Sequence, residues 1–157
     1  MSVVTNDPAI SSPTIYYNAQ TSPAVMTNGL TAFNTTGDIL VFALLSECYT
    51  ANDATASTLQ YTVTNNSTAT SQTMSGASTA LISSPAGTSV VSLLGALTNI
   101  PTVTNAAGVG VFPWGAIRVP GNSSIKLNVG VGSTTGKWRH YLHWQPLEQG
   151  AVATSAF

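Results

Sequence analysis

The sequence predicts an all-β protein: an antiparallel β-sandwich or jelly roll with an extended N-terminal arm. Short apolar segments alternate with Gly, Pro, Ser and Thr along the 157 residues, and many short strands joined by such turns are typical of these folds. Several segments alternate apolar and polar residues strictly, as a strand with one buried face does. We expect an arm over residues 1–36, a sandwich domain over 37–147 and a C-terminal tail over 148–157.

The arm is predicted because residues 1–36 contain three prolines and scattered apolar residues without a helical period. Proline withholds a ladder donor and favours extended backbone before it, so this segment is expected to run along a surface rather than build a sheet. Asn28 and Gly29 are a strong turn signal that could fold part of the arm into a hairpin. The arm either frays or packs on a neighbouring chain.

Two strands are expected in the next segment. Residues 39–45 (ILVFALL) form a continuous apolar run, which indicates a strand buried on both faces; its β-branched and aromatic members favour a strand over a buried helix. Leu59, Tyr61 and Val63 alternate with polar residues, which indicates a half-buried strand. A turn is expected at residues 65–67.

Residues 69–106 carry no charge, and several short strands fit them best. Val90, Leu93, Leu94 and Leu97 also fall at helical spacing, so a short helix is the alternative there. Gly95 weakens the helix.

The C-terminal third has the clearest pattern. Ile117 and Val119 lead through a turn at residues 120–122 into a strand that alternates strictly over 125–131. A glycine-bounded loop at 132–136 then precedes a second alternating strand, and we expect the two strands to form an antiparallel hairpin. In the second strand one face carries Trp138, His140, Leu142 and Trp144, and the other carries Lys137, Arg139, Tyr141 and His143.

Two glycine-rich patterns are poor matches to nucleotide-binding motifs. Residues 132–137 (GSTTGK) have three residues between the glycines where a phosphate-binding loop needs four, and a strand follows instead of a helix. The glycines at 130, 132 and 136 also miss the dinucleotide-binding spacing. We expect a hairpin turn and no cofactor.

No catalytic or metal-binding group is predicted. His140 and His143 lie three apart on a strand, so they point to opposite faces and cannot bind one ion together. Cys48 follows Glu47, an acidic neighbour that disfavours a thiolate nucleophile, and a small buried residue is the expected role. No Gly-x-Ser-x-Gly elbow presents a serine. We therefore expect a protein that is not an enzyme.

The composition points to association with other subunits. Charged residues make up 6% of the chain and the net charge is −1, where soluble domains ordinarily carry about 25% charged residues. This charge disfavours binding to nucleic-acid phosphates, and no apolar run is long enough to span a membrane. A single cysteine forms no internal disulfide, and no secretory signal is readable, so synthesis in a cytosol is expected. An almost uncharged surface favours association.

The expected contact residues are aromatic or Arg side chains, which dominate interface energetics. The candidates are Tyr16, Tyr17, Trp114 and Arg118. Acidic residues lie early in the chain and basic residues late, so opposite charges either meet across an interface or are solvated singly. The three tryptophans are expected in the core, with Trp114 as the exception.

Three segments carry a family resemblance: residues 37–48 (GDILVFALLSEC), residues 51–61 (ANDATASTLQY) and residues 129–147, which begin VGVGSTTGKW and end WQPL. They resemble small virion proteins of tailed bacteriophages over roughly residues 37–150, with the arm unmatched. The resemblance implies a structural β-sandwich protein of the particle, most like a capsid decoration or cement protein.

Such a protein is expected to be a homotrimer on the capsid exterior, bound to the major capsid protein and made in the host cytoplasm. In that case the arm threads along the shell or an adjacent protomer, and many weak contacts add by avidity. A tail or neck fibre domain that binds a receptor or glycan is the main alternative. A free carbohydrate-binding module, with Trp114, Trp138 or Trp144 stacked on sugar rings, is a third possibility.

Overall fold

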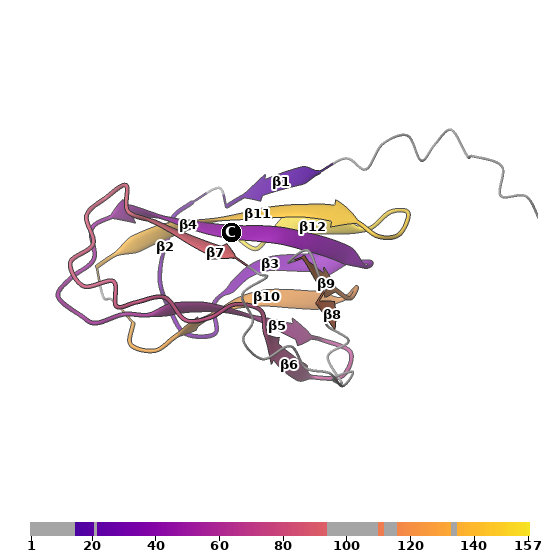
Figure 1. The fold of residues 1–157 in the computed structure, drawn as a ribbon, viewed down its shortest axis with the longest axis horizontal. Helices are drawn as coiled ribbons and strands as arrows, with labels where there is room; N and C mark the ends of the chain where they lie inside the picture. The colour runs from indigo at the N-terminus through magenta and orange to yellow at the C-terminus, as the bar shows by residue number, and fades with distance from the viewer. Residues whose placement is uncertain (1–14, 21, 94–109, 112–115, 133–134) are drawn as a thin grey trace, which may run out of the picture.

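A computed structural model describes residues 15–20, 22–93, 110–111, 116–132 and 135–157. All regular structure in these ranges is β-strand, arranged in two antiparallel sheets that pack as a β-sandwich (Figure 1). None of the described residues belongs to a helix that is long and apolar enough to cross a membrane. The all-β prediction is therefore confirmed.

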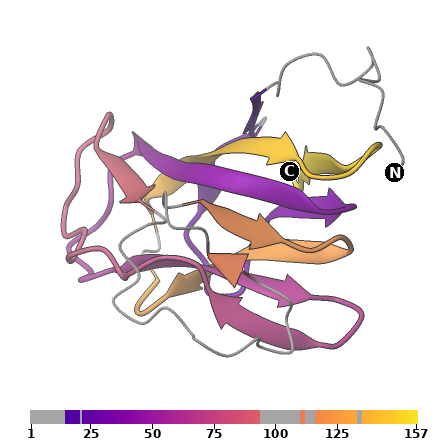
Figure 2. The same cartoon turned by 45° about the vertical axis from the view of Figure 1, so that its right-hand side comes forward.

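The first sheet has seven strands in the order β1-β11-β4-β9-β8, with β2 paired to β11 and β7 paired to β4. Its centre is the long pair β4 and β11, which run side by side from Thr50 opposite Lys137 to Ile39 opposite Pro146 (Figure 2). The strands are β1 (Tyr16–Ala19), β2 (Ala24–Val25), β4 (Ile39–Thr50), β7 (Ser89–Leu93), β8 (Gly110–Val111), β9 (Ile117–Val119) and β11 (Lys137–Pro146).

The second sheet has five strands in the order β12-β3-β10-β5-β6. Its central strand β10 pairs with β5 from Ser123 opposite Asn65 to Val129 opposite Leu59, and with β3 on its other side. The strands are β3 (Thr31–Thr36), β5 (Leu59–Asn65), β6 (Thr70–Thr73), β10 (Ser123–Val129) and β12 (Val152–Ser155).

The core lies between the two sheets and follows the alternation of the sequence. Leu59, Tyr61 and Val63 on β5 are fully buried, as their spacing predicts. On β11 the predicted inner face is also confirmed, because residues 138, 140, 142 and 144 are buried while the residues between them are exposed or half-buried. Trp138, Tyr61 and Phe33 are the largest fully buried side chains, and each large apolar side chain contributes about 1.5–3 kcal/mol.

The strand over 39–45 is also confirmed, and it continues to Thr50. Beyond Leu44 only alternate residues, Ser46 and Cys48, are fully buried. The expected role of Cys48 as a small buried residue is confirmed. In the segment where a short helix was the alternative, Ser89–Leu93 is strand β7, and residues 94–97 lie outside the described residues.

The predicted hairpin between residues 125–131 and 137–144 is wrong. β10 lies in the five-stranded sheet and β11 in the seven-stranded sheet, so the chain crosses from one sheet to the other between them. Each strand has one apolar face. Two such strands can bury these faces equally well in one sheet or in two sheets packed across a core, and here they lie in different sheets.

The N-terminal segment contributes strands where an extended arm was expected. Thr31–Thr36 is β3, which lies between β12 and β10 and buries Phe33. The turn at Asn28 and Gly29 is present, with Leu30 N–H donating to Thr27 O at 3.1 Å and a φ of 81° at Gly29. Its flanks pair with other strands rather than with each other, so no hairpin forms. Residues 1–14 lie outside the described residues.

The C-terminal segment is likewise part of a sheet. Within the expected tail, Val152–Ser155 forms edge strand β12 against β3, and Ala151 and Ala153 are buried. The sequence did not indicate this strand. Its residues are small and pair with β3 through backbone hydrogen bonds, which do not require an alternation of large apolar and polar side chains.

Candidate functional site

The two outer faces of the sandwich differ in chemistry. On the five-stranded sheet the outward side chains are mostly Thr, Ser, Asn and Gln, and they hydrogen-bond across the strands. Ser124 Oγ donates to Asn34 Oδ1 at 3.0 Å and accepts from Asn66 Nδ2 at 3.1 Å. Asn128 Nδ2 donates to Gln60 Oε1 at 2.7 Å. This polar face offers little apolar area to a partner.

The outer face of the seven-stranded sheet carries aromatic and apolar side chains instead. They come from β1, β4, β7 and β11, which are neighbours in that sheet (Figure 1). We call this surface the aromatic face. It comprises Tyr17, Leu45, Glu47, Tyr49, Val91, Arg139, Tyr141 and His143.

Ring contacts organise the aromatic face. β1 pairs with β11 so that Tyr17 lies opposite His143. The Tyr17 ring therefore lies 4.9 Å from the His143 ring, edge to face, and 5.7 Å from the Tyr141 ring, stacked. At the other end the Arg139 guanidinium lies 5.5 Å from the centroid of the Tyr49 ring, within cation–π distance.

Much of this aromatic and apolar surface is open to solvent. Tyr17 is 56% exposed, Tyr49 61% and Val91 58%. Val91 lies directly opposite Leu45 in the β4–β7 pair, so the apolar area is continuous with the central strands. Contiguous exposed apolar surface of this kind marks interaction sites in soluble proteins.

The charges on the aromatic face balance each other. Glu47 and Arg139 are directly opposite residues on β4 and β11, and the Tyr141 hydroxyl donates to Glu47 Oε2 at 2.8 Å. Partial burial raises the pKa of Tyr141, and its hydrogen bond to Glu47 raises this pKa further against the opposing effect of Arg139. The Tyr141 hydroxyl therefore stays a donor at neutral pH.

The structure separates the four contact candidates. Tyr17 lies on the aromatic face, whereas Tyr16 points to the other side of β1 and stacks on Trp144 at 4.9 Å. Trp114 lies outside the described residues. Arg118 forms a salt bridge with Asp38 of the same chain, and its Nε donates to Asp38 Oδ2 at 2.9 Å.

Opposite charges were expected either to meet across an interface or to be solvated one by one. For Asp38 and Arg118 this is wrong, because the two side chains pair within the same chain. Asp38 also accepts the Gly121 N–H at 2.9 Å. Burial opposes ionisation of Asp38, but the Gly121 N–H and the Arg118 guanidinium outweigh it and hold the pKa of this carboxyl below its usual value.

Sequence reasoning did not single out Tyr49, Tyr141, Arg139 or His143 as contact residues. The available signal was strand β11 itself, which places aromatic residues on both faces: tryptophans on one and Tyr141 and His143 on the other. A solvent face of this composition is typical of interaction surfaces.

The two described tryptophans are core residues. Trp138 is fully buried and its indole N–H donates to Asn52 Oδ1 at 2.8 Å, while Trp144 is 4% exposed. The prediction of core tryptophans is confirmed for these two. Neither presents a ring to a sugar, so the idea that Trp138 or Trp144 stacks on a glycan is wrong.

A polar cluster lies inside the core, beneath the aromatic face. Ser46 on β4, Tyr61 on β5 and His140 on β11 are fully buried. His140 Nδ1 lies 2.9 Å from Ser46 Oγ and 2.8 Å from Tyr61 Oη, and the two hydroxyls also bond to each other. A Ser–His pair is the geometry of an activated nucleophile, but with all three side chains buried no substrate can approach Ser46 Oγ in this conformation.

Histidine positions agree with the prediction. His140 faces the core, and His143 lies on the exposed opposite face of β11. Within the described ranges, no three His, Cys, Asp or Glu side chains are grouped so that they could hold a metal ion.

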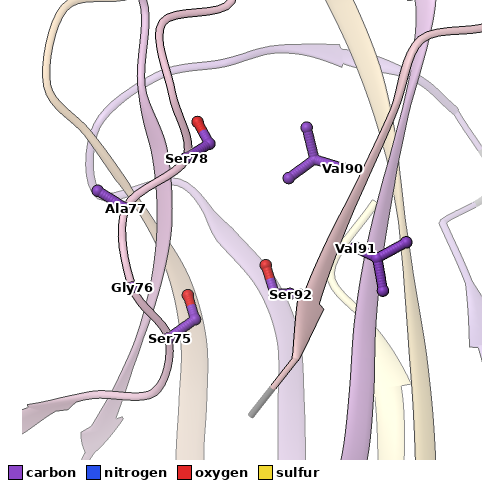
Figure 3. A pocket seen from close by; sticks show the side chains of 7 residues that line it. All are labelled: Ser75, Gly76, Ala77, Ser78, Val90, Val91 and Ser92. Carbon is purple, nitrogen blue, oxygen red and sulfur yellow. The ribbon is translucent and has the colours of Figure 1, made fainter. Parts of the chain in front are cut away.

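A small hollow lies between the loop at residues 75–78 and strand β7. Its volume is about 230 Å³, and Figure 3 shows the loop on one side and β7 on the other. The lining side chains are Ser, Ala and Val, with none that titrates and none that is charged. This hollow can hold a small neutral group, but it supplies no acid, base or nucleophile beyond serine hydroxyls.

The chain matches no protein-family model, no curated protein and no solved structure.

Proposed function

We propose that this chain is a structural virion protein of a tailed bacteriophage that decorates and stabilises the capsid shell through multivalent contacts with neighbouring major capsid subunits. One observation carries the proposal: the aromatic face exposes apolar and aromatic side chains with balanced charges, whereas the opposite face is polar. A sandwich with two such different faces binds a surface on one side and faces solvent on the other.

A decoration protein needs area rather than a cavity, which is what the aromatic face supplies. Tyr and Arg side chains carry most of the energy in protein interfaces, and the face has three tyrosines and one arginine. Contacts that are weak singly become strong when a homotrimer presents several copies to a repeating shell. The proposal includes a jelly-roll arrangement of the sandwich and an N-terminal arm that reaches along the shell or an adjacent protomer.

The alternative is a tail or neck fibre domain that binds a receptor or glycan. The exposed rings of Tyr17 and Tyr49 support it, because flat aromatic rings beside the charged and polar groups of Arg139 and Glu47 also suit sugar rings. Electron microscopy of virions that carry this chain separates the two proposals: density for it over the shell supports decoration, and density only on the tail or neck supports the fibre.

The contact surface is tested by two neighbouring tyrosines. Tyr17→Ala removes a ring from the aromatic face, and Tyr16→Ala removes a ring of similar exposure from the other side of the same strand. We expect Tyr17→Ala to weaken binding to shells that lack the protein by about tenfold or more, as truncation of an interface tyrosine does. The measurement is co-sedimentation of the purified protein with such shells across a concentration series.

Tyr16→Ala is expected to bind within about twofold of the unaltered protein. Equal losses in the two variants would show that β1 matters for folding and not for contact. If neither variant loses affinity for the shells, the aromatic face is not the contact surface. Deletion of residues 1–14 tests the arm separately, since binding and shell stability that are unchanged by it would contradict threading.

A further inference from the structure

The buried cluster of Ser46, Tyr61 and His140 connects the two sheets. Ser46 and His140 belong to the seven-stranded sheet and Tyr61 to the five-stranded sheet. The hydrogen bond between Tyr61 Oη and His140 Nδ1, with 2.8 Å between the two atoms, therefore crosses the core. The surrounding core is largely apolar, and there an unpaired polar group is costly.

The surroundings of His140 suit a neutral imidazole better than a charged one. Nδ1 lies within hydrogen-bond distance of both Ser46 Oγ and Tyr61 Oη. When Nδ1 is an acceptor, one of these hydroxyls donates to Nδ1 and the other donates to the oxygen of its neighbouring hydroxyl. Nε2 is buried and has no partner among the described residues. A protonated ring carries an N–H on both nitrogens: the hydroxyl oxygens can accept from Nδ1, but the Nε2–H and the full positive charge find no partner among the described residues.

In the described part of the chain, no acidic group faces His140 from the elements packed around it. On β4 the inward neighbours of Ser46 are Leu44 and Cys48, and on β5 those of Tyr61 are Leu59 and Val63. The inward neighbours on β11 are Trp138 and Leu142. Gln20, which follows β1, holds the His140 backbone with two hydrogen bonds of 3.1 Å through its own N–H and its Oε1.

The titratable groups on these inner faces are thus Tyr61 and Cys48. Burial raises the pKa of both, so each is neutral at and below neutral pH. Glu47, Arg139, Tyr141 and the other charged or titratable residues of β4 and β11 alternate onto the aromatic face, on the far side of the sheet. Among the residues that the structure describes, a proton on His140 would have no counter-charge within the core.

We propose that Ser46, Tyr61 and His140 form an acid-sensitive latch, which joins the two sheets while His140 is neutral and releases them when His140 takes up a proton. Because His140 lies under Arg139 and Tyr141 on the same strand, release of the latch also disturbs the aromatic face above it.

The direction of the pH effect follows from proton linkage. Burial lowers the pKa of His140 to about 3 in the folded protein, from about 6.5 in the unfolded chain. The unfolded state therefore binds more protons between these values, so the stabilisation is complete above pH 6.5 and falls as the pH drops toward 3. Between pH 7 and pH 4.5 the equilibrium constant for unfolding should rise roughly fiftyfold to a hundredfold from this one residue.

The test is denaturant unfolding between pH 7 and pH 4.5 in the full chain, with two histidine variants of the same strand. His143→Gln removes the exposed histidine and should keep the full rise in the unfolding constant. His140→Gln removes the buried one and should abolish most of the rise. An equal rise in His140→Gln and the unaltered chain would overturn the latch, as would loss of the rise in His143→Gln.

A second measurement needs no variant at position 140, which covers the case in which His140→Gln does not fold. The ring signals of His140 in an NMR titration of the unaltered folded protein should stay in the neutral form down to about pH 5. A His140 ring that gains its proton near pH 6.5 without loss of the folded signals would contradict the proposal. Tyr61→Phe completes the test, because it must lower stability at pH 7 if the hydroxyl joins the sheets.

Discussion

At the scale of single residues, buried amides do the work of joining loops to the core. Asn52 is almost fully buried, its Nδ2 donates to Leu81 O at 2.8 Å and its Oδ1 accepts the Trp138 indole N–H at 2.8 Å. Its backbone N–H donates to Ser84 O. Gly136 packs against it so closely that a Cβ at this position would overlap Asn52 Oδ1. One amide thus ties the loop around Leu81 to β11.

We therefore predict that Asn52→Ala destabilises the fold by about 2–4 kcal/mol, because it leaves a buried indole N–H and a buried carbonyl without partners. Asn128→Ala is the control: Asn128 is exposed and bonds only to Gln60 in the described structure, so its loss should change stability by less than about 0.5 kcal/mol. Urea unfolding of the two variants at pH 7 measures both. If the two variants lose similar free energies of unfolding, the burial of Asn52 does not explain its contribution to stability.

At the scale of elements, three connections meet at one end of the sandwich. The turn from β3 to β4 contains Gly37 and Asp38, and Asp38 N–H donates to Glu148 Oε1 at 2.8 Å while its carbonyl accepts the Leu147 N–H at 2.9 Å. The Asp38 carboxylate binds Arg118 and the Gly121 N–H. The chain passes between the two sheets at β3–β4 and again at β9–β10, so this junction helps to fix how the sheets stack.

Gly37 is the residue on which this junction depends. Its φ is +76°, and a Cβ there would lie 2.9 Å from Ala151 Cα. Gly29 has a similar φ of +81° but no atom within 4 Å of such a Cβ. We predict that Gly29→Ala costs about 1–2 kcal/mol, the cost of the left-handed backbone alone, and that Gly37→Ala costs distinctly more because Ala151 must also move.

Thermal unfolding of the two glycine variants, with sedimentation to check that both remain folded, makes this comparison. Gly37→Ala should have the lower melting temperature by several degrees. Equal melting temperatures would mean that the β3–β4 turn and the C-terminal segment shift apart at little cost, and the junction would then not set the stacking of the sheets.

At the scale of the whole molecule, the low charge and the aromatic face point in the same direction. With four basic and five acidic residues, of which Asp38 and Arg118 pair with each other, little charge remains to keep copies apart. The polar face is satisfied by its own hydrogen bonds, and the aromatic face is not covered by any described part of the chain. We therefore expect such a molecule to associate with other subunits.

We accordingly predict that the protein sediments as a trimer at micromolar concentration and physiological salt. Because association is attributed to apolar and aromatic contact rather than to charge, the trimer should persist at about 1 M salt, where the Debye length is about 3 Å. Sedimentation equilibrium at low and high salt measures this. A stable single copy at high concentration would contradict association as the basis of the proposed function.

Prediction from sequence succeeded where the property is local. The alternation on β5 and β11 correctly assigned inner and outer residues, and the opposite orientation of His140 and His143 followed from it. The period of two is a property of a single strand, so it needs no knowledge of the partner. Association with other subunits, which the composition predicts, stays a prediction.

Strand pairing could not be read in the same way. β10 and β11 follow each other in the chain yet lie in different sheets, and β3 lies between β12 and β10 although its segment was expected to run along a surface. The sequence by itself determined that this is an all-β chain and which side chains point inward. Only the tertiary structure decided that Tyr17, Tyr49 and Tyr141 share one face and that Tyr61 meets His140, because pairing depends on how distant segments bury their apolar faces together.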